Sequence, residues 1–404
     1  MLTRSPLAPK AFPQLPAIDG VRTASLAVGV KYANREDVLV AELTEGTTVA
    51  GVFTKSLCPS APVDWCRQVL PKGTARALVV NSGNANAFTG SAGIASVERT
   101  AAAAARVFDC AVNEVFLAST GVIGEPLPDE KITAAFPKAK EALKAGAWSG
   151  AAGAIMTTDT FPKGATAKAT LGGVEVTING IAKGSGMIAP DMATMLGFLF
   201  TDANLPAGLL QKLLSDASDR SFNCVTVDSD TSTSDTVLLF ATGKAGNDPD
   251  ADLADFKRAL NEVCTDLAQQ LAKDGEGAEK FVTIAITGAE NREAAKVIAL
   301  AVANSPLVKT AVAGEDANWG RVVMAIGKAG QKAERDKIAI TIGGIQVAKD
   351  GQVVPGYDEA PVAQHMKGRN IVIEADVGVG SGAATVWTCD LTHRYIDINA
   401  DYRT

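Results

Sequence analysis

Short runs of β-branched and other apolar residues recur along the chain, and most of them end in glycine or serine. Runs of this kind predict buried strands that lead into turns. They are ALVVNSG, EVFLASTG, DTVLLFATG, KFVTIAITG, KIAITIGG and NIVIEADVG.

Longer segments between these runs have helical periodicity or are rich in alanine. They predict helices over 92–108, 205–220, 251–273 and 289–304. Another helical segment, 129–154, is expected to be interrupted by Pro137 and around Gly146 and Gly150. Strands mixed with helices predict an α/β (α+β) fold built in layers. A new strand-helix-strand unit begins at AITGAENREAAKV, which predicts a lobe boundary near residue 285.

Composition narrows the class of protein. The 404 residues, 47% hydrophobic and 21% charged, are typical of a globular chain with more than one core. A net charge of -7 argues against nucleic acid as a partner, because phosphate binding needs a basic surface. The N-terminal segment has prolines where a signal peptide has an apolar run, and no segment is long enough to span a bilayer. We therefore expect a cytoplasmic protein with no membrane partner.

Cysteine and histidine offer little material for catalysis. The six cysteines show no CxxC spacing, which favours free thiols in a reducing compartment. His365 and His393 are the two histidines, and neither adjoins a nucleophile motif, so a structural or surface role is favoured. We expect neither a metal site nor a cofactor.

Three polar or glycine-rich segments each allow a functional and a structural interpretation. GVGSGA (378–383) fits a relaxed dinucleotide fingerprint, but too little chain follows it for the required helix, so we interpret it as a turn. DSDTSTSDT (228–236) offers oxygens to a cation, yet it lacks the calcium-loop glycine and glutamate, which favours a polar turn. NSGNANAFTG (81–90) suits a tight functional loop and an ordinary turn equally well.

The segment KGSGMIAPDMATMLGFLFTDA (183–203) places Thr194, preceded by Ala193, in a largely apolar strand-like stretch. The ordinary interpretation of Thr194 is a residue of a buried strand. A threonine hydroxyl can also attack the carbonyl before it, here that of the small Ala193, and hydrolysis of the ester frees an α-amine on Thr194. That amine can serve as the base of its own nucleophile, so no histidine is required.

Such a nucleophile needs donors aimed at the developing oxyanion. FLASTGVIG (116–124) ends a predicted strand with Thr120 and Gly121, whose hydroxyl and N–H could supply them. A plain turn remains the alternative interpretation.

The segment AKGSGMIAPDMATMLGFLFTDA closely resembles the self-cleavage segment of the ornithine acetyltransferase (ArgJ) family. NSGNANAFTG, STGVIGEPLP, AIMTTDTFPK, DGEGAEKFV, GEDANWGRV and INADYRT resemble further family motifs in family order, so the resemblance covers essentially the whole chain. It implies a layered αββα sandwich of the N-terminal-nucleophile-like, DmpA-type architecture with a second α/β lobe. The lobes would be about 1–285 and 286–404.

The resemblance also implies a reaction. Cleavage between Ala193 and Thr194 would give an α chain, 1–193, and a β chain, 194–404, which stay associated as an α2β2 assembly. Thr194 would accept acetyl from N2-acetylornithine and pass it to glutamate, with Thr120 and Gly121 as the oxyanion hole. Glutamate N-acetyltransferase activity is thus expected, while use of acetyl-CoA as a co-substrate stays open.

Substrate-binding positions follow from the same motifs. They would be Thr157, Lys183, Thr194, Glu276, Asn399 and Thr404. Thr158 is an alternative to Thr157, and without the resemblance Lys183 and Glu276 would be interpreted as a surface cation and a solvated loop acid. Glu279 and Arg403 depart from the family pattern without removing a motif residue.

Two other functions are consistent with the same residues. An aminopeptidase or amidase of similar fold would pass the acyl group to water instead of glutamate. A binding or regulatory protein would use cleavage only for maturation, or would not be cleaved.

Overall fold

The computed structural model describes residues 3–189 and 195–400. The chain divides into two compact units. The sandwich unit comprises Pro9–Asn223 and Asp230–Leu267, and the C-terminal unit comprises Met1–Ala8, Cys224–Ser229 and Ala268–Thr404. The expected lobe boundary near 285 falls inside β10 (Phe281–Ala289), whereas the chain passes between the units inside α6 (Ala254–Lys273).

The first sheet of the sandwich unit has the strand order β1-β2-β4-β5. Its strands are β1 (Val21–Leu26), β2 (Val38–Leu43), β4 (Ala77–Asn84) and β5 (Val115–Val122). β4 and β5 are parallel, with Gly83 opposite Gly121, and the other pairs are antiparallel. The polar ends of β4 and β5 therefore lie at one edge of this sheet.

The second sheet of this unit has the order β3-β9-β8-β7-β6. Its strands are β3 (Thr48–Phe53), β6 (Lys163–Leu171), β7 (Val174–Lys183), β8 (Leu196–Thr201) and β9 (Thr236–Ala241). β8 runs parallel to β9 and antiparallel to β7. Every residue of β8 and β9 is buried, which is why both strands appear in the sequence as unbroken apolar runs.

The main core of the unit lies between its two sheets. Leu78 and Phe116 of the first sheet pack in one cluster with Phe198, Phe200 and Phe240 of the second. The Phe200 and Phe240 rings stack with centroids 5.4 Å apart. The alternate residues of β4 and β5 belong to a separate cluster that includes helical side chains. Each strand of the first sheet is thus apolar on both faces.

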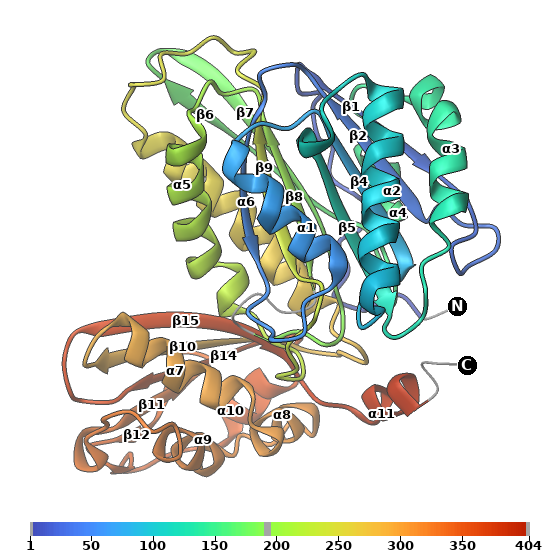
Figure 1. Cartoon of the computed structure of the whole chain (residues 1–404). Helices are drawn as coiled ribbons and strands as arrows, with labels where there is room; N and C mark the ends of the chain where they lie inside the picture. The colour runs from blue at the N-terminus through green and yellow to red at the C-terminus, as the bar shows by residue number, and fades with distance from the viewer. Residues whose placement is uncertain (1–2, 190–194, 401–404) are drawn as a thin grey trace. The chain divides into compact units, whose positions relative to one another are not determined.

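Helices cover the outer faces of the two sheets (Figure 1). α2 and α3 pack on the first sheet, and α6 contacts the second through Val263 and Leu267. The helices of this unit besides α6 are α1 (Ala61–Val69), α2 (Gly90–Phe108), α3 (Asp129–Ala142), α4 (Trp148–Ala154) and α5 (Ala207–Arg220). The short 3-10 helices of the chain are η1 (Leu70–Lys72), η2 (Val112–Glu114), η3 (Phe222–Cys224) and η4 (Arg335–Lys337).

The C-terminal unit contains a sheet of order β13-β12-β11-β14-β10-β15. Its further strands are β11 (Ala339–Ile342), β12 (Ile345–Lys349), β13 (Gln352–Val353), β14 (Asn370–Asp376) and β15 (Gly382–Cys389). Its helices are α7 (Arg292–Ala303), α8 (Pro306–Ala313), α9 (Trp319–Gly327), α10 (Ala360–Met366) and α11 (His393–Ala400). Among the described residues no single helix has the length and apolar composition to cross a membrane, although α7 and α8 together meet that test with a 56° bend between them.

The predicted fold class is confirmed: the structure is an αββα sandwich with a second α/β unit. All six predicted strands are present, and the helices predicted at 92–108, 205–220, 251–273 and 289–304 correspond to α2, α5, α6 and α7. The interpretation of GVGSGA as a turn is also confirmed, because this segment joins β14 directly to β15 without a helix.

The predicted interruption at Pro137 is wrong. Pro137 lies inside α3, and the break in the helical segment comes at residues 143–147, around Gly146. Because Pro137 is exposed, water can bond the carbonyl that its missing N–H leaves free. Gly150 lies inside α4.

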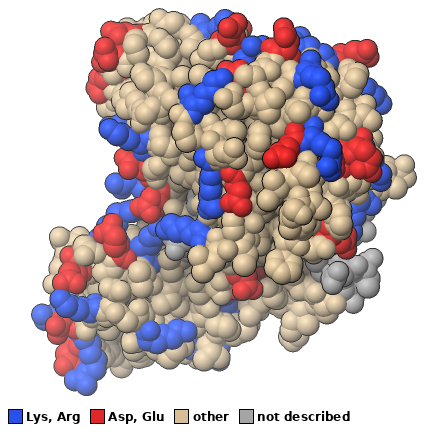
Figure 2. Space-filling model, in the orientation of Figure 1, with Lys and Arg blue, Asp and Glu red and all other residues tan. Residues whose placement is uncertain are grey.

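Charged side chains are interspersed on the molecular face in Figure 2, where lysine and arginine alternate with aspartate and glutamate. Ion pairs such as Arg258–Glu262 and Lys168–Glu175 are exposed examples. On this face the basic side chains do not gather into a patch of the kind that binds a phosphate backbone.

We predict that Phe200→Ala lowers the free energy of unfolding of the sandwich unit by about 3–5 kcal/mol, because it opens a cavity beside Phe240 and Trp148. Urea unfolding followed by tryptophan fluorescence measures the change. Phe88→Ala is the matched control, since Phe88 is 84% exposed and little stability should be lost. Equal losses in the two variants would contradict the assignment of the core.

Candidate active site

Three neighbouring strands bring polar groups to one edge of the second sheet. The register places Lys183 of β7 beside Leu196 of β8, and Leu196 beside Thr236 of β9. Met195, which precedes β8, is the first described residue after the predicted cleavage position. Ala193 and Thr194 themselves lie outside the described residues, so their assigned roles stay predictions.

Thr120 and Gly121 end β5 in the first sheet. Gly121 has φ +133°, and a Cβ built there would lie 2.3 Å from the carbonyl carbon of Gly83. No other residue fits this close approach of two parallel strands. The side chain of Thr120, one residue earlier, is buried. The requirement for glycine at 121 thus has a packing cause in addition to any role in chemistry.

Lys183 joins the two sheets of the sandwich unit. Its Nζ donates a hydrogen bond of 3.2 Å to Oγ1 of Thr120, and the residue is only 2% exposed. The alternative interpretation of Lys183 as a surface cation is therefore wrong. A hydroxyl that accepts a bond from a cation keeps its own proton free to donate and becomes a stronger donor. The geometry suits Thr120 to stabilise a developing negative charge.

A buried carboxylate, Asp159, organises the backbone around Lys183. It accepts hydrogen bonds from Lys163 Nζ at 2.7 Å, Gly184 N at 2.6 Å and Thr157 N at 3.0 Å. Burial by itself would raise the pKa of Asp159, but the charges of Lys163 and Lys183 and the hydrogen bonds hold it well below its usual range. Asp159 is therefore an anion whose hydrogen bonds hold the loop before β6 against the end of β7.

The two candidate threonines for substrate contact differ in their hydrogen bonds. Thr158 Oγ1 lies 2.7 Å from Oγ of buried Ser185, whereas the described structure contains no hydrogen bond to the Thr157 hydroxyl. Both residues are half-buried. The free hydroxyl favours Thr157 as the substrate contact, and this assignment stays a prediction.

Asp235 lies at the same edge of the second sheet, directly before β9. It is fully buried, and its Oδ1 accepts the N–H of Met195 at 2.8 Å. Its Oδ2 is buried without a hydrogen-bond partner in the described structure. Burial raises the pKa of Asp235 well above its usual range, against the opposing effects of the Met195 N–H and the charge of Lys183.

Glu276 and Asn399 form a second polar pair, within the C-terminal unit. Asn399 Nδ2 donates to Glu276 Oε2 at 2.7 Å, and Glu276 is buried, so its interpretation as a solvated loop acid is wrong. Gly277 fits against the start of α11, where a Cβ would lie 2.7 Å from Tyr395 N. The turn that carries Glu276 is thus docked on the helix that carries Asn399. Thr404 and Arg403 lie outside the described residues.

Neither histidine lies in these clusters. His365 Nε2 accepts the N–H of Val372 at 3.1 Å, and partial burial lowers its pKa. His393 begins α11. Within residues 3–189 and 195–400, no group of three or more His, Cys, Asp or Glu side chains is placed to hold a metal ion.

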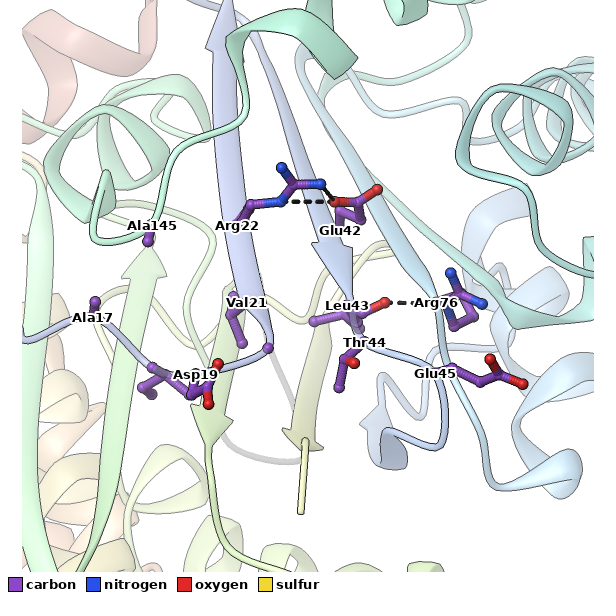
Figure 3. Close-up of a pocket in the computed structure, with 12 residues that line it drawn as sticks. Ala17, Asp19, Val21, Arg22, Glu42, Leu43, Thr44, Glu45, Arg76 and Ala145 are labelled. Carbon is purple, nitrogen blue, oxygen red and sulfur yellow. Dashed lines mark hydrogen bonds and ion pairs between the residues drawn. The ribbon is translucent and has the colours of Figure 1, made fainter. Parts of the chain in front are cut away.

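A surface groove of about 810 Å³ lies at the opposite end of the first sheet (Figure 3). It is formed where β2 ends and β4 begins, whereas Thr120 lies where β5 ends. In this groove Arg22 pairs with Glu42, and Arg76 Nε bonds the Leu43 carbonyl at 3.1 Å. The groove is therefore separate from the Thr120 and Lys183 cluster.

Sequence analysis missed Asp159, Lys163 and Asp235. The first two stand four positions apart in TTDTFPK, a spacing that favours ion pairs in helices but is uninformative in a loop. Asp235 was included in a polar turn, although the apolar run directly after it indicates that it enters the core. An acid adjoining a fully apolar strand is the signal that could have identified it.

Asp159→Asn should destabilise the protein at pH 7 by about 3 kcal/mol, because it removes the carboxylate that forms an ion pair with the buried ammonium of Lys163. The folded pKa of Asp159 lies below its unfolded value, so its contribution is present above about pH 4 and is lost as the pH falls. The difference between variant and wild type should therefore shrink towards pH 3. Thermal unfolding across this range measures it, with exposed Asp64→Asn as the control. A constant difference would contradict the lowered pKa.

Comparisons with known proteins show the family to which the chain belongs. The model of the ArgJ family matches residues 22–404. The arginine biosynthesis bifunctional protein ArgJ of Agrobacterium fabrum is 57% identical over 408 residues, covering 99% of each chain. The protein of the same name from Mesorhizobium japonicum is 58% identical over 410 residues, which covers 100% of this chain and 99% of that one.

Solved structures include two of similar sequence. The Bacillus halodurans ArgJ structure is 41% identical with a TM-score of 0.48, and the match covers 49% of this chain and 95% of that chain. Ornithine acetyltransferase from Mycobacterium tuberculosis, solved with ornithine, is 34% identical with a TM-score of 0.38, and the match covers 46% and 95%. The family model and the full-length relatives together show that this chain belongs to the ArgJ family of arginine biosynthesis proteins.

Proposed function

We propose that this protein is a self-cleaving acetyltransferase that moves acetyl from N2-acetylornithine to glutamate through Thr194. One observation carries the proposal. Lys183, which bonds the oxyanion candidate Thr120, is also the strand neighbour of Leu196, only two residues after Thr194. The chain directly after the proposed nucleophile thus shares a sheet edge with the group proposed to stabilise its transition state.

Cleavage comes first in this mechanism. Oγ1 of Thr194 attacks the Ala193 carbonyl, and the peptide nitrogen leaves with a proton to give an ester. Water then hydrolyses the ester, which releases the Ala193 carboxylate and a free α-amine on Thr194. The amine has an unperturbed pKa of about 7.7–8.0, suitable for a base at neutral pH. The scarcity of histidine in the described clusters is consistent with this source of base.

Acetyl transfer follows in two halves. The Thr194 hydroxyl gives its proton to the α-amine and attacks the acetyl carbonyl, and the Thr120 hydroxyl with the Gly121 N–H stabilises the oxyanion. Ornithine leaves with the proton, and acetyl remains on Thr194 as an ester. The amine of glutamate then attacks this ester, so N-acetylglutamate is released and the nucleophile is restored. The order is ping-pong, with one acyl-enzyme intermediate.

Charged groups of the described clusters suit substrates of this class. Lys183 is a buried cation that can pair with an α-carboxylate, and Glu276 is a buried acid that can pair with an ammonium group. Asn399 and Thr157 add hydrogen-bonding groups, and Thr404 is assigned with them through the resemblance. We propose that the two products of cleavage stay together as an α2β2 assembly in the cytoplasm and that no metal or cofactor takes part.

The wild-type protein should migrate as two fragments, 1–193 and 194–404, whose masses sum to the full chain plus one water. Thr194→Ala should stay intact and should lose transfer entirely, because both steps need the hydroxyl. Intact-mass spectrometry and an acetylornithine–glutamate assay make these measurements. Thr177→Ala in β7 is a control that should cleave and transfer normally. Full transfer by Thr194→Ala would rule out the mechanism.

Release of ornithine from N2-acetylornithine should depend on glutamate, with only about one equivalent per site released in its absence, because the acyl-enzyme waits for the acceptor. Chromatographic measurement of ornithine with and without glutamate tests this. Sustained release in water alone would favour the amidase alternative. Acetyl-CoA with glutamate, in the same assay, determines whether the enzyme also has amino-acid N-acetyltransferase activity.

A further inference from the structure

The backbone directly after Thr194 is held on both sides by the segment that begins β9. Asp235 Oδ1 accepts the Met195 N–H at 2.8 Å, and the Thr236 N–H donates to the Met195 carbonyl at 3.2 Å. Both polar backbone groups of Met195 are therefore fixed. One of these contacts is an ordinary backbone hydrogen bond, but the other requires a particular side chain at 235.

The nitrogen that Asp235 binds belongs to the peptide bond between Thr194 and Met195. Rotation of this peptide plane turns the carbonyl end of Thr194, and with it the directions in which its amine and hydroxyl can point. Fixing the nitrogen thus restrains the nucleophile from its C-terminal side. Small misplacements of a reacting group are costly, and a shift of about 1 Å can reduce a rate about 100-fold.

Burying the Asp235 carboxyl beside the Met195 N–H lowers the stability of the fold. The side chain is 0% exposed, and its Oδ2 has no partner in the described structure. The nearby Thr54 hydroxyl donates to the Ser232 carbonyl at 2.7 Å and also acts on the Asp235 carboxyl. A buried carboxyl with one unsatisfied oxygen lowers stability. The hydrogen bond to the Met195 N–H depends on the carboxyl side chain at position 235.

The location of Asp235 links it to the rest of the site. Asp159 accepts the N–H of Gly184, the residue after Lys183, and Asp235 accepts the N–H of Met195, whose neighbour Leu196 pairs with Lys183. Lys183 in turn bonds Thr120. The group that restrains Met195 is therefore part of the same buried network as the proposed oxyanion donor.

We infer that Asp235 is a positioning residue, whose carboxyl fixes the Thr194–Met195 peptide so that Thr194 is oriented for both self-cleavage and acetyl transfer. The inference rests on the proposed function, because it gives a role to a residue that acts through Thr194. It adds a residue from the β9 side of the site, where the resemblance placed none.

Three substitutions at position 235 test the hydrogen-bond acceptor separately from the size and shape of the side chain. Asp235→Asn keeps an oxygen that can accept the Met195 N–H, in a side chain of nearly the same size. Asparagine also resembles the neutral form of the Asp235 carboxyl, which burial favours. Asp235→Leu keeps the branched shape in a somewhat larger side chain without the acceptor, and Asp235→Ala removes both shape and acceptor. The matched control is Asp202→Ala, since Asp202 accepts the Thr177 N–H at 2.8 Å just beyond the other end of β8.

We expect Asp235→Leu and Asp235→Ala to slow self-cleavage and kcat per cleaved chain by about 100-fold, with KM for N2-acetylornithine nearly unchanged. Asp235→Asn and Asp202→Ala should cleave and transfer within a few-fold of wild type. Cleavage is followed by intact mass, transfer by steady-state kinetics, and folding by thermal unfolding of each variant.

Several outcomes would overturn the inference. Wild-type cleavage and kcat in a folded Asp235→Leu would do so, as would equal losses in Asp235→Asn and Asp235→Leu. Failure of both Leu and Ala variants to fold would show that the contact serves stability alone. Thr194→Ala, measured alongside, separates the two ideas: if it transfers acetyl, the proposed function fails, whereas an inert Thr194→Ala with a fully active Asp235→Leu removes only the role of Asp235.

Discussion

The buried ammonium of Lys183 is the constraint around which the sandwich unit is arranged. A cation at 2% exposure is stable only with nearby acceptors and negative charge. Here Thr120 accepts a hydrogen bond from the ammonium, and the charge of Lys183 acts on Asp159 and Asp235. These partners come from β5, from the loop before β6 and from the start of β9. One charge therefore ties together segments distant in sequence, and it does so where both sheets end.

The two buried acids beside Lys183 differ in their partners and therefore in the charge they carry. Asp159 has Lys163 as a direct partner and two or more backbone donors, so its negative charge is stabilised. Asp235 has one backbone donor and an unsatisfied oxygen, so its neutral form is favoured. Asp159 compensates the positive charge of the nearby lysines, and Asp235 holds the Met195 N–H in place. The charge of Lys163 beside Asp159 is the main cause of this difference.

Much of the fold followed from the sequence because strands buried on both faces produce unbroken apolar runs, as in β8 and β9. The helices α2 and α7 were equally clear from their periodicity. The prediction of a break at Pro137 was wrong because a helix tolerates proline where water can bond the freed carbonyl. The sequence does not show which positions are exposed to water. Burial of Lys183 and Glu276 was missed for a related reason: their partners, Thr120 and Asn399, are 63 and 123 positions away.

The position of β8 in the middle of its sheet has a consequence for the pieces on either side of residue 194. In the order β3-β9-β8-β7-β6, the outer strands β3, β7 and β6 precede this residue, and the inner pair β9 and β8 follows it. Neither piece can form the sheet alone, since each would leave strand edges open to pairing with other chains. Strands from the two sides of residue 194 are thus interleaved in one sheet. The cleavage proposed above therefore requires that the intact chain fold first.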